Sequence, residues 1–162
     1  MADHVLDRGR LDEAVGNDIA DMAQFWMLRK FQFLESARTQ FEVVVDPWLS
    51  YCEEPSQNEI MAYNMAFTDW LLFERPYYHG KTLLELYVDE PPASISPASL
   101  GRLKQVRDTQ YFSRFGILDK DPATGMVALR DTRTDCRFDV YDPHIVQKEH
   151  WRDGAIAVRI AC

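Results

Sequence analysis

The apolar residues of this chain change their period near Gln110, and that change limits the fold more than any other feature. Before Gln110, apolar residues recur at steps of three, four and seven, the spacing of one face of a helix. After it, apolar and polar residues alternate, which is typical of strands with one buried face. The sequence therefore predicts an α+β protein, with a helical N-terminal half followed by an antiparallel β-module over about residues 109–161.

Four strands are expected in the β-module. They cover residues 111–118, 126–131, 136–141 and 155–160, and turn-forming residues such as Asp, Gly and Pro separate them. Alternation directs seven apolar side chains inward: Val127, Leu129, Phe138, Val140, Ile156, Val158 and Ile160. Four strands this short form either a β-meander or a small SH3-like barrel, and we expect one of these two folds.

The N-terminal half begins with residues 1–16, which suggest a frayed leader or a short helix that packs little. Asn17 and Asp18 then fit the start of a long helix, because the pair supplies an N-cap and an acid in the first turn, which suits the positive end of the helix dipole. Two apolar stripes follow along this helix: Met22, Trp26, Met27, Phe31, Phe33, Leu34, Ala37, Phe41, Val44 and Val45. A helix exposed on one side needs only one stripe, so this one is either central to the fold or part of a homodimer surface.

Residues 40–50 stay open between helix and strand. The run Val43–Val45 is β-branched, which suits a strand as well as the end of a helix, and Pro47 would end either element.

Ser56 and Glu59 match a capping box, in which each side chain satisfies a free backbone N–H at the start of a helix. The predicted helix covers residues 57–74 and ends before Pro76. It is apolar nearly all round toward its end, so we expect it to be the most buried element. Residues 82–88 suit either a short helix or a strand.

A linker is predicted at Glu90–Ser94, where two prolines remove backbone donors and favour extended structure. The domain boundary is expected there. Residues 1–90 would form a helical region, and residues 95–162 a helix plus the β-module, packed as one compact unit. Ser96–Pro97 supplies the N-cap and the first residue of that helix, which should run to about residue 107.

The net charge of −8 is unevenly distributed. Residues 1–96 carry 7 Lys and Arg against 17 Asp and Glu, whereas residues 97–162 carry 11 against 9. An acidic surface repels phosphate backbones, which disfavours nucleic-acid binding by the chain as a whole. No apolar run approaches the ~20 residues that span a bilayer, and the first residues lack the pattern of a signal peptide. We expect a cytoplasmic protein with no membrane partner.

No residue set reaches the specificity of a catalytic or metal motif. His79–Thr82 reads His-Gly-Lys-Thr, like the end of a phosphate-binding loop, but Arg75 stands where the first glycine belongs, so a turn is the better interpretation. Asp119, Asp121 and Gly125 are similar to part of a calcium loop, but the glycine comes one residue late and the final glutamate is missing. A hairpin turn explains these residues as well.

His79, His144 and His150 could offer metal ligands only if the fold brought them together, and no closely spaced cysteine pair is present to complete a zinc site. The three cysteines are expected to be reduced, unpaired thiols: Cys52, Cys136 and Cys162. We therefore expect no metal and no cofactor. Local signatures of an activated nucleophile are also missing, so the catalytic residues, if any, stay unknown and enzyme activity is the less favoured interpretation.

The best binding signal comes from outward-facing residues of the β-module: Arg130, Arg137, Tyr141 and Arg159. Arginine charge beside an aromatic ring is typical of surfaces that bind single-stranded nucleic acid. Asp131 and Asp139 lie on or near the same surface, however, and the local net charge is close to balance. An ordinary solvated face is the favoured alternative.

Five segments together resemble a known group of proteins: Phe67–Phe73, Gly80–Tyr87, Val127–Thr134, Phe138–Val140 and Asp153–Ile160. Their order and spacing are similar to those of an uncharacterised bacterial family, some members of which carry a cysteine-rich, zinc-binding SEC-C motif at one end. The SEC-C motif itself is absent here, so the resemblance carries over no metal ligand. It implies a bacterial, cytoplasmic protein and no particular activity.

The leading hypothesis is a non-enzymatic interaction module that binds a protein partner. The apolar helices would form the core or a homodimer surface, and the β-module would present a binding face. Two alternatives remain: a nucleic-acid-binding small β-barrel protein, and a hydrolase or transferase whose residues meet only in the fold.

Overall fold

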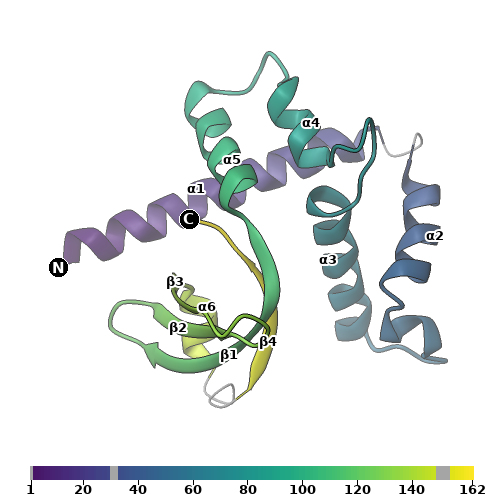
Figure 1. Ribbon diagram of the computed structural model, residues 1–162. Helices are drawn as coiled ribbons and strands as arrows, with labels where there is room; N and C mark the ends of the chain where they lie inside the picture. The colour runs from purple at the N-terminus through teal and green to yellow at the C-terminus, as the bar shows by residue number, and fades with distance from the viewer. Residues whose placement is uncertain (1, 30–32, 149–153) are drawn as a thin grey trace. The chain divides into compact units, whose positions relative to one another are not determined.

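The computed structural model describes residues 2–29, 33–148 and 154–162, with side chains from Asp7 onward, and it has an α+β fold (Figure 1). The predicted fold class is therefore confirmed. The elements follow the chain in this order: α1 (Ala2–Met27), α2 (Leu34–Val44), the 3-10 helix η2 (Trp48–Tyr51), α3 (Gln57–Phe73), α4 (Leu83–Asp89), α5 (Pro97–Thr109), β1 (Tyr111–Asp121), β2 (Met126–Asp131), β3 (Arg137–Tyr141), α6 (Pro143–Gln147) and β4 (Ala155–Ile160).

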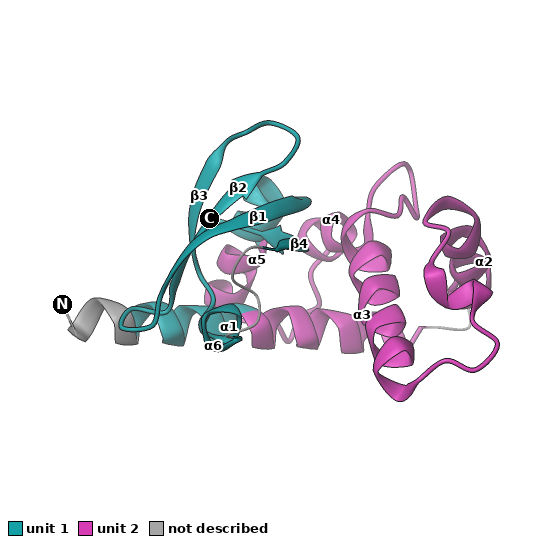
Figure 2. Ribbon diagram, turned by 90° about the horizontal axis from the view of Figure 1, so that it is seen from below, with its two compact units in different colours: residues 1–15, 104–162 teal, residues 16–103 magenta. Residues whose placement is uncertain are grey.

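The chain forms two compact units, coloured separately in Figure 2. The sheet unit comprises residues 1–15 and 104–162, and the helical unit comprises residues 16–103. The chain passes from one unit to the other within α1 and again within α5. This division differs from the sequence-based boundary at 90–95. The start of α1, residues 1–15, is in the same unit as the strands, which come much later in the chain.

The sheet unit contains one four-stranded antiparallel sheet in the order β3-β2-β1-β4. The long central strand β1 pairs with β4 along its first half and with β2 along its second half, with a bulge between Ile117 and Asp119. The last strand joins β1 and not β3, so the sheet stays open. Only the first three strands follow a meander, and the SH3-like barrel is not confirmed.

Helix α6 replaces the loop expected after β3. The Asp142 carboxylate accepts hydrogen bonds from the backbone N–H groups of His144 and Ile145, both at 2.9 Å, and Pro143 occupies the first helical position. The side chain of Ile145 is buried in the core.

The core of the sheet unit lies on one face of the sheet. Its buried residues are Phe115, Ile117, Val127, Leu129 and Ile145. Seven partly buried residues pack against them: Tyr111, Phe138, Val140, Val146, Ile156, Val158 and Ile160. The aromatic rings of Phe115 and Phe138 meet edge to face with centroids 5.8 Å apart. All seven residues predicted to point inward are among these two groups, so the predicted facing of the strands is confirmed.

Asp131 is a fully buried carboxylate at the end of β2. It accepts hydrogen bonds from the Tyr111 hydroxyl, from Ser113 Oγ at 3.1 Å and from the backbone N–H of Arg133 at 2.7 Å. These bonds, with that of Tyr111 the largest cause, hold the pKa of the Asp131 carboxyl well below its usual range. One side chain thus joins the start of β1 to the turn between β2 and β3.

The helical unit is held together by aromatic rings and one buried ion pair. Phe41 of α2 packs against Tyr63, Phe67 and Trp70 of α3, with ring centroids 5.3–5.4 Å apart. Asp18, only 6% exposed, accepts two hydrogen bonds from the Arg102 guanidinium, at 2.6 and 3.1 Å. This bidentate pair links α1 to α5 within the unit.

Two expectations about the first helices were wrong. Residues 1–16 do not form a separate leader, because α1 runs without a break from Ala2 to Met27. Asp18 lies inside α1 and pairs with Arg102, so it is not an N-cap. The long helix expected after it is in fact divided between α1 and α2, and Phe31 of the expected stripe lies outside the described residues.

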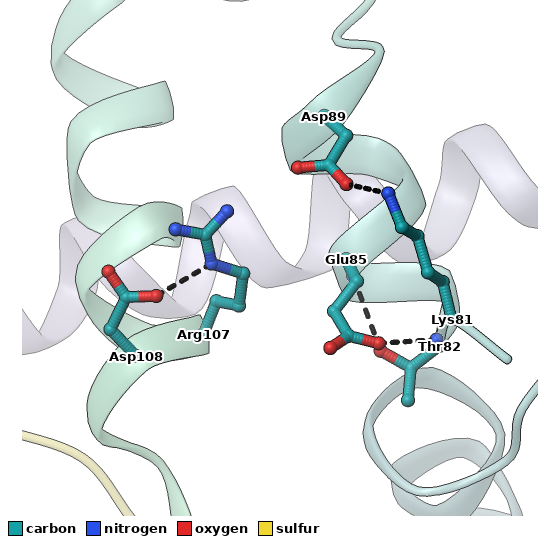
Figure 3. Close-up of polar contacts among 6 residues, drawn as sticks. All are labelled: Lys81, Thr82, Glu85, Asp89, Arg107 and Asp108. Carbon is teal, nitrogen blue, oxygen red and sulfur yellow. Dashed lines mark hydrogen bonds and ion pairs between the residues drawn. The ribbon is translucent and has the colours of Figure 1, made fainter.

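Both regions that the sequence left open between helix and strand contain helices, and a capping box starts one of them. The capping box at Ser56 and Glu59 is present, and α3 covers all but the last residue of the predicted range. A second box at Thr82 and Glu85 makes residues 83–89 a helix (Figure 3). Residues 34–44 are helical as well, so no strand forms at Val43–Val45.

We expect the Asp131→Asn variant to have a Tm several degrees below that of the wild type at pH 7. The amide –NH₂ group of asparagine is a hydrogen-bond donor, and it would face groups that are themselves donors to the Asp131 carboxylate. The carboxylate stabilises the fold at pH values above its unfolded pKa of about 3.9, and this contribution is lost as the pH falls through the lower folded pKa. The difference in Tm, measured by circular dichroism, should therefore narrow between pH 7 and pH 3. A difference that stays constant with pH would contradict this role.

Candidate functional site

Four arginines share the outer face of the sheet, opposite the core. Arg130 of β2 lies directly across from Arg137 of β3 and from Gly116 of β1. Arg114 lies two residues before Gly116 on the same face, and Arg159 of β4 is paired with Phe112. We call Arg114, Arg130, Arg137 and Arg159 the arginine face. The structure thus brings together the three arginines predicted from the sequence and adds a fourth.

Carboxylates reduce the charge of this face. Arg137 Nη2 lies 2.9 Å from Asp139 Oδ1, and Arg130 Nε lies 3.7 Å from Asp135 Oδ1. The Arg159 guanidinium is centred 5.4 Å from the ring of Phe112. Arg114 is exposed and has no ion pair within the described part of the chain. Arg130 and Arg137 therefore share their charge with neighbouring acids.

Tyr141, the fourth residue predicted for this site, lies on the same face but is covered by α1. A Cβ atom at Gly9 would lie 3.2 Å from the Tyr141 hydroxyl, and one at Gly125 would lie 2.8 Å from its ring. Beside it, Arg8 Nη1 lies 3.2 Å from the sulfur of Met126. Tyr141 therefore packs against α1. Its side chain is half-buried there and is not part of the exposed arginine face.

The segment with phosphate-loop resemblance forms a turn, as expected. His79 and Gly80 both have positive φ, and Tyr78 bridges to Lys81. Figure 3 shows what the next two side chains do: Lys81 Nζ donates to Asp89 at 2.6 Å, and the Thr82 hydroxyl caps α4. The lysine and the threonine of the apparent phosphate-binding motif therefore both make hydrogen bonds to neighbouring residues of α4.

The calcium-like segment is a hairpin turn. Asp121 accepts hydrogen bonds from the Ala123 N–H at 2.9 Å and from the Thr124 hydroxyl at 2.6 Å, and Asp119 lies within β1. Among the residues with described positions, no group of three or more His, Cys, Asp or Glu side chains is arranged to hold a metal ion. His79 belongs to the helical unit and His144 to the sheet unit, while His150 lies outside the described residues. The three cysteines are free.

A second candidate site is a groove along α3, with a volume of about 620 Å³. Of the ten described residues that line it, one is Ile19 of α1. The other nine belong to α3: Gln57, Ile60, Met61, Asn64, Met65, Thr68, Asp69, Leu72 and Phe73. Their steps of three and four mark a single face of the helix. We call this feature the α3 groove.

Helix α3 therefore has two apolar faces, which explains its nearly uniform apolar sequence. One face, with Phe67 and Trp70, packs against Phe41 of α2. The other opens into the α3 groove, where Met61 is 58% exposed and Met65 is 66% exposed. The expectation that this helix is the most buried element holds only for its C-terminal half.

The chemistry of the α3 groove favours binding over catalysis. The described residues that line it include no His, Cys, Ser or Tyr, and Asp69 is the one ionisable residue among them. Leu72 and Phe73 are buried at its base, whereas the two methionines are exposed along it. A surface of this kind can bury apolar groups from another molecule but offers no activated nucleophile or acid–base pair.

Exposed apolar side chains are concentrated in the helical unit. Thirteen large apolar residues are exposed in the described ranges, and ten of them belong to this unit. Contiguous exposed apolar surface is typical of interaction sites, because leaving it in water costs free energy that a partner can recover. The groove was not predicted from the sequence, since periodicity alone does not show which apolar face of α3 is open to solvent.

No family model, no curated protein and no solved structure matches this chain. In the described part of the chain, none of the helices combines the length and the apolar character that a bilayer crossing requires.

The contact of Tyr141 with Gly125 can be tested by adding a single methyl group. Gly125 has φ +73°, and its Cβ would enter the tyrosine ring, so Gly125→Ala should lower the free energy of unfolding by about 2 kcal/mol or more. Urea denaturation followed by tryptophan fluorescence would measure this loss. The control is Gly154→Ala, where nothing lies within 4 Å of the added atom. Equal stability of the two variants would contradict the placement of Tyr141.

Proposed function

We propose that this chain is a protein-interaction module whose helical unit binds an apolar segment of a partner protein in the α3 groove. The observation that carries the proposal is the second apolar face of α3, which is open along its length and exposes Met61 and Met65. Full burial of a methionine side chain stabilises an interface by roughly 1.5–3 kcal/mol. Two such residues on one face are enough to anchor a partner helix or strand.

Methionine also suits this role because its side chain is flexible and polarisable and can adapt to differently shaped partners. The polar lining residues Gln57, Asn64 and Thr68 alternate with the apolar ones and can orient a bound segment by hydrogen bonds. The rings that pack α3 against α2 are those of Tyr63, Phe67 and Trp70, whereas the two methionines are exposed to solvent. Changing them should therefore alter binding much more than folding.

Selection from a phage library of 16-residue helices would test this proposal. We expect enriched peptides whose affinity falls at least tenfold for the Met61→Gln/Met65→Gln variant, a loss equivalent to about 1.4 kcal/mol. A matched control is Val43→Gln/Val44→Gln, since these α2 residues are 78% and 70% exposed but do not line the groove. The proposal fails if no selected peptide distinguishes the methionine variant from this control.

Nucleic-acid binding by the sheet unit is a second candidate, favoured by one specific observation: with Arg114 on β1, the arginine face has one arginine on each of the four neighbouring strands of an open sheet. The pairing of Arg130 and Arg137 with acids weighs against it. The sheet unit as a whole carries 12 Lys and Arg against 13 Asp and Glu, which also gives little attraction for phosphates.

This second candidate predicts weak, salt-dependent binding of a fluorescein-labelled 15-residue oligothymidylate, measured by anisotropy. Binding should be lost in Arg114→Glu/Arg130→Glu, because each contacted phosphate contributes a log–log salt slope of about −0.7 for single strands. A variant with the same charge change elsewhere in the unit, Lys104→Glu/Lys148→Glu, should keep most of the binding. Equal binding by both variants, or none by the wild type, would rule out this function.

A further inference from the structure

We infer that the occupant of the α3 groove is a cationic amphipathic α-helix of a partner protein. This inference rests on the proposed function of the groove and adds the chemistry and the shape of the ligand.

The length of the groove indicates a helix. Its lining residues begin at Gln57 and end at Phe73, the first and last residues of α3. Seventeen helical residues span about 25 Å at 1.5 Å per residue. A partner helix laid along α3 would therefore match it over four to five turns, with its own apolar residues at steps of three and four facing the methionines.

Charge indicates that this helix is cationic. The helical unit carries 6 Lys and Arg against 13 Asp and Glu, a net charge of −7. Among the described residues that line the groove there is no Lys or Arg, and the charged one is Asp69. A low-dielectric apolar surface within an acidic unit attracts positive charge at its borders. On a bound amphipathic helix, lysine and arginine side chains would lie on the outward side, where the negative potential of the helical unit attracts them.

A second copy of this chain is a poorer occupant by the same reasoning. Self-association through α3 would place two units of net charge −7 against each other, and none of the described lining residues of the groove is basic and could offset the repulsion. A basic helix removes this penalty and gains attraction in its place. The flexible methionines can then adjust to the apolar face of such a helix.

Three synthetic 17-residue peptides test the inference. They share one leucine face and carry Lys, Gln or Glu at every outward position. Binding is measured through the ¹³C-methyl resonances of Met61 and Met65 in the full chain. We expect the Lys peptide to bind at least tenfold more tightly than the Gln peptide in low salt, with the Glu peptide weakest. The advantage should shrink as salt is added, because the Debye length falls to about 8 Å at 0.15 M.

The methionine variants separate groove binding from general attraction to an acidic protein. Met61→Gln/Met65→Gln keeps every charge, so a tenfold loss of Lys-peptide affinity would support binding in the groove. Unchanged affinity would overturn the inference. Val43→Gln/Val44→Gln is again the control and should bind the Lys peptide as the wild type does.

The remaining outcomes distinguish this inference from the proposed function. If all three peptides bound with equal affinity at the methionine methyls, the inference that the partner helix is cationic would be overturned, and the proposed protein-binding function would stand. No shift of either methyl by any peptide would overturn both. A light-scattering mass of a dimer that Met61→Gln/Met65→Gln converts to a monomer would make a second copy the occupant and overturn the inference.

Discussion

The buried carboxylate of Asp131 supports the register on which the sheet unit depends. It receives hydrogen bonds from Tyr111 and Ser113 at the start of β1 and from the backbone of the next turn. Side chains alternate between the faces of a strand, so a shift of one residue between β1 and β2 would carry arginines into the core and apolar residues into water. Both the core and the arginine face therefore depend on the register that this group supports. Its desolvation is offset because every donor around it is directed at an ionised acceptor.

Local signals predicted most of the secondary structure. The period-two pattern placed all four strands to within a few residues, and the box at Ser56 placed the start of α3. The failures involve long-range partners. Asp18 has the chemistry of a helix cap, but its partner is Arg102, 84 residues away, and only the fold brings the two together. Closure of the sheet likewise depended on whether β4 would pair with β1 or β3, which turn residues do not decide.

The candidate sites were predictable to different degrees. Alternation along β1 places Arg114 on the outer face, so continuing the strand pattern by one strand would have found the fourth arginine. The α3 groove was beyond such reasoning, because Met61 and Phe67 look equally buried in the sequence and only the position of Phe41 separates their faces. The resemblance to SEC-C-associated proteins stays a prediction.

The sheet unit is assembled from the two ends of the chain, and this has a consequence for the order of folding. Domains generally fold as they leave the ribosome. Residues 16–103 emerge as one continuous stretch, so the helical unit can form while the strands are still being made. Gly9 and its neighbours in α1 must wait for Met126 and Tyr141 before their packing surface exists. During that interval the residues around Gly9 lack the surface against which they pack in the folded sheet unit.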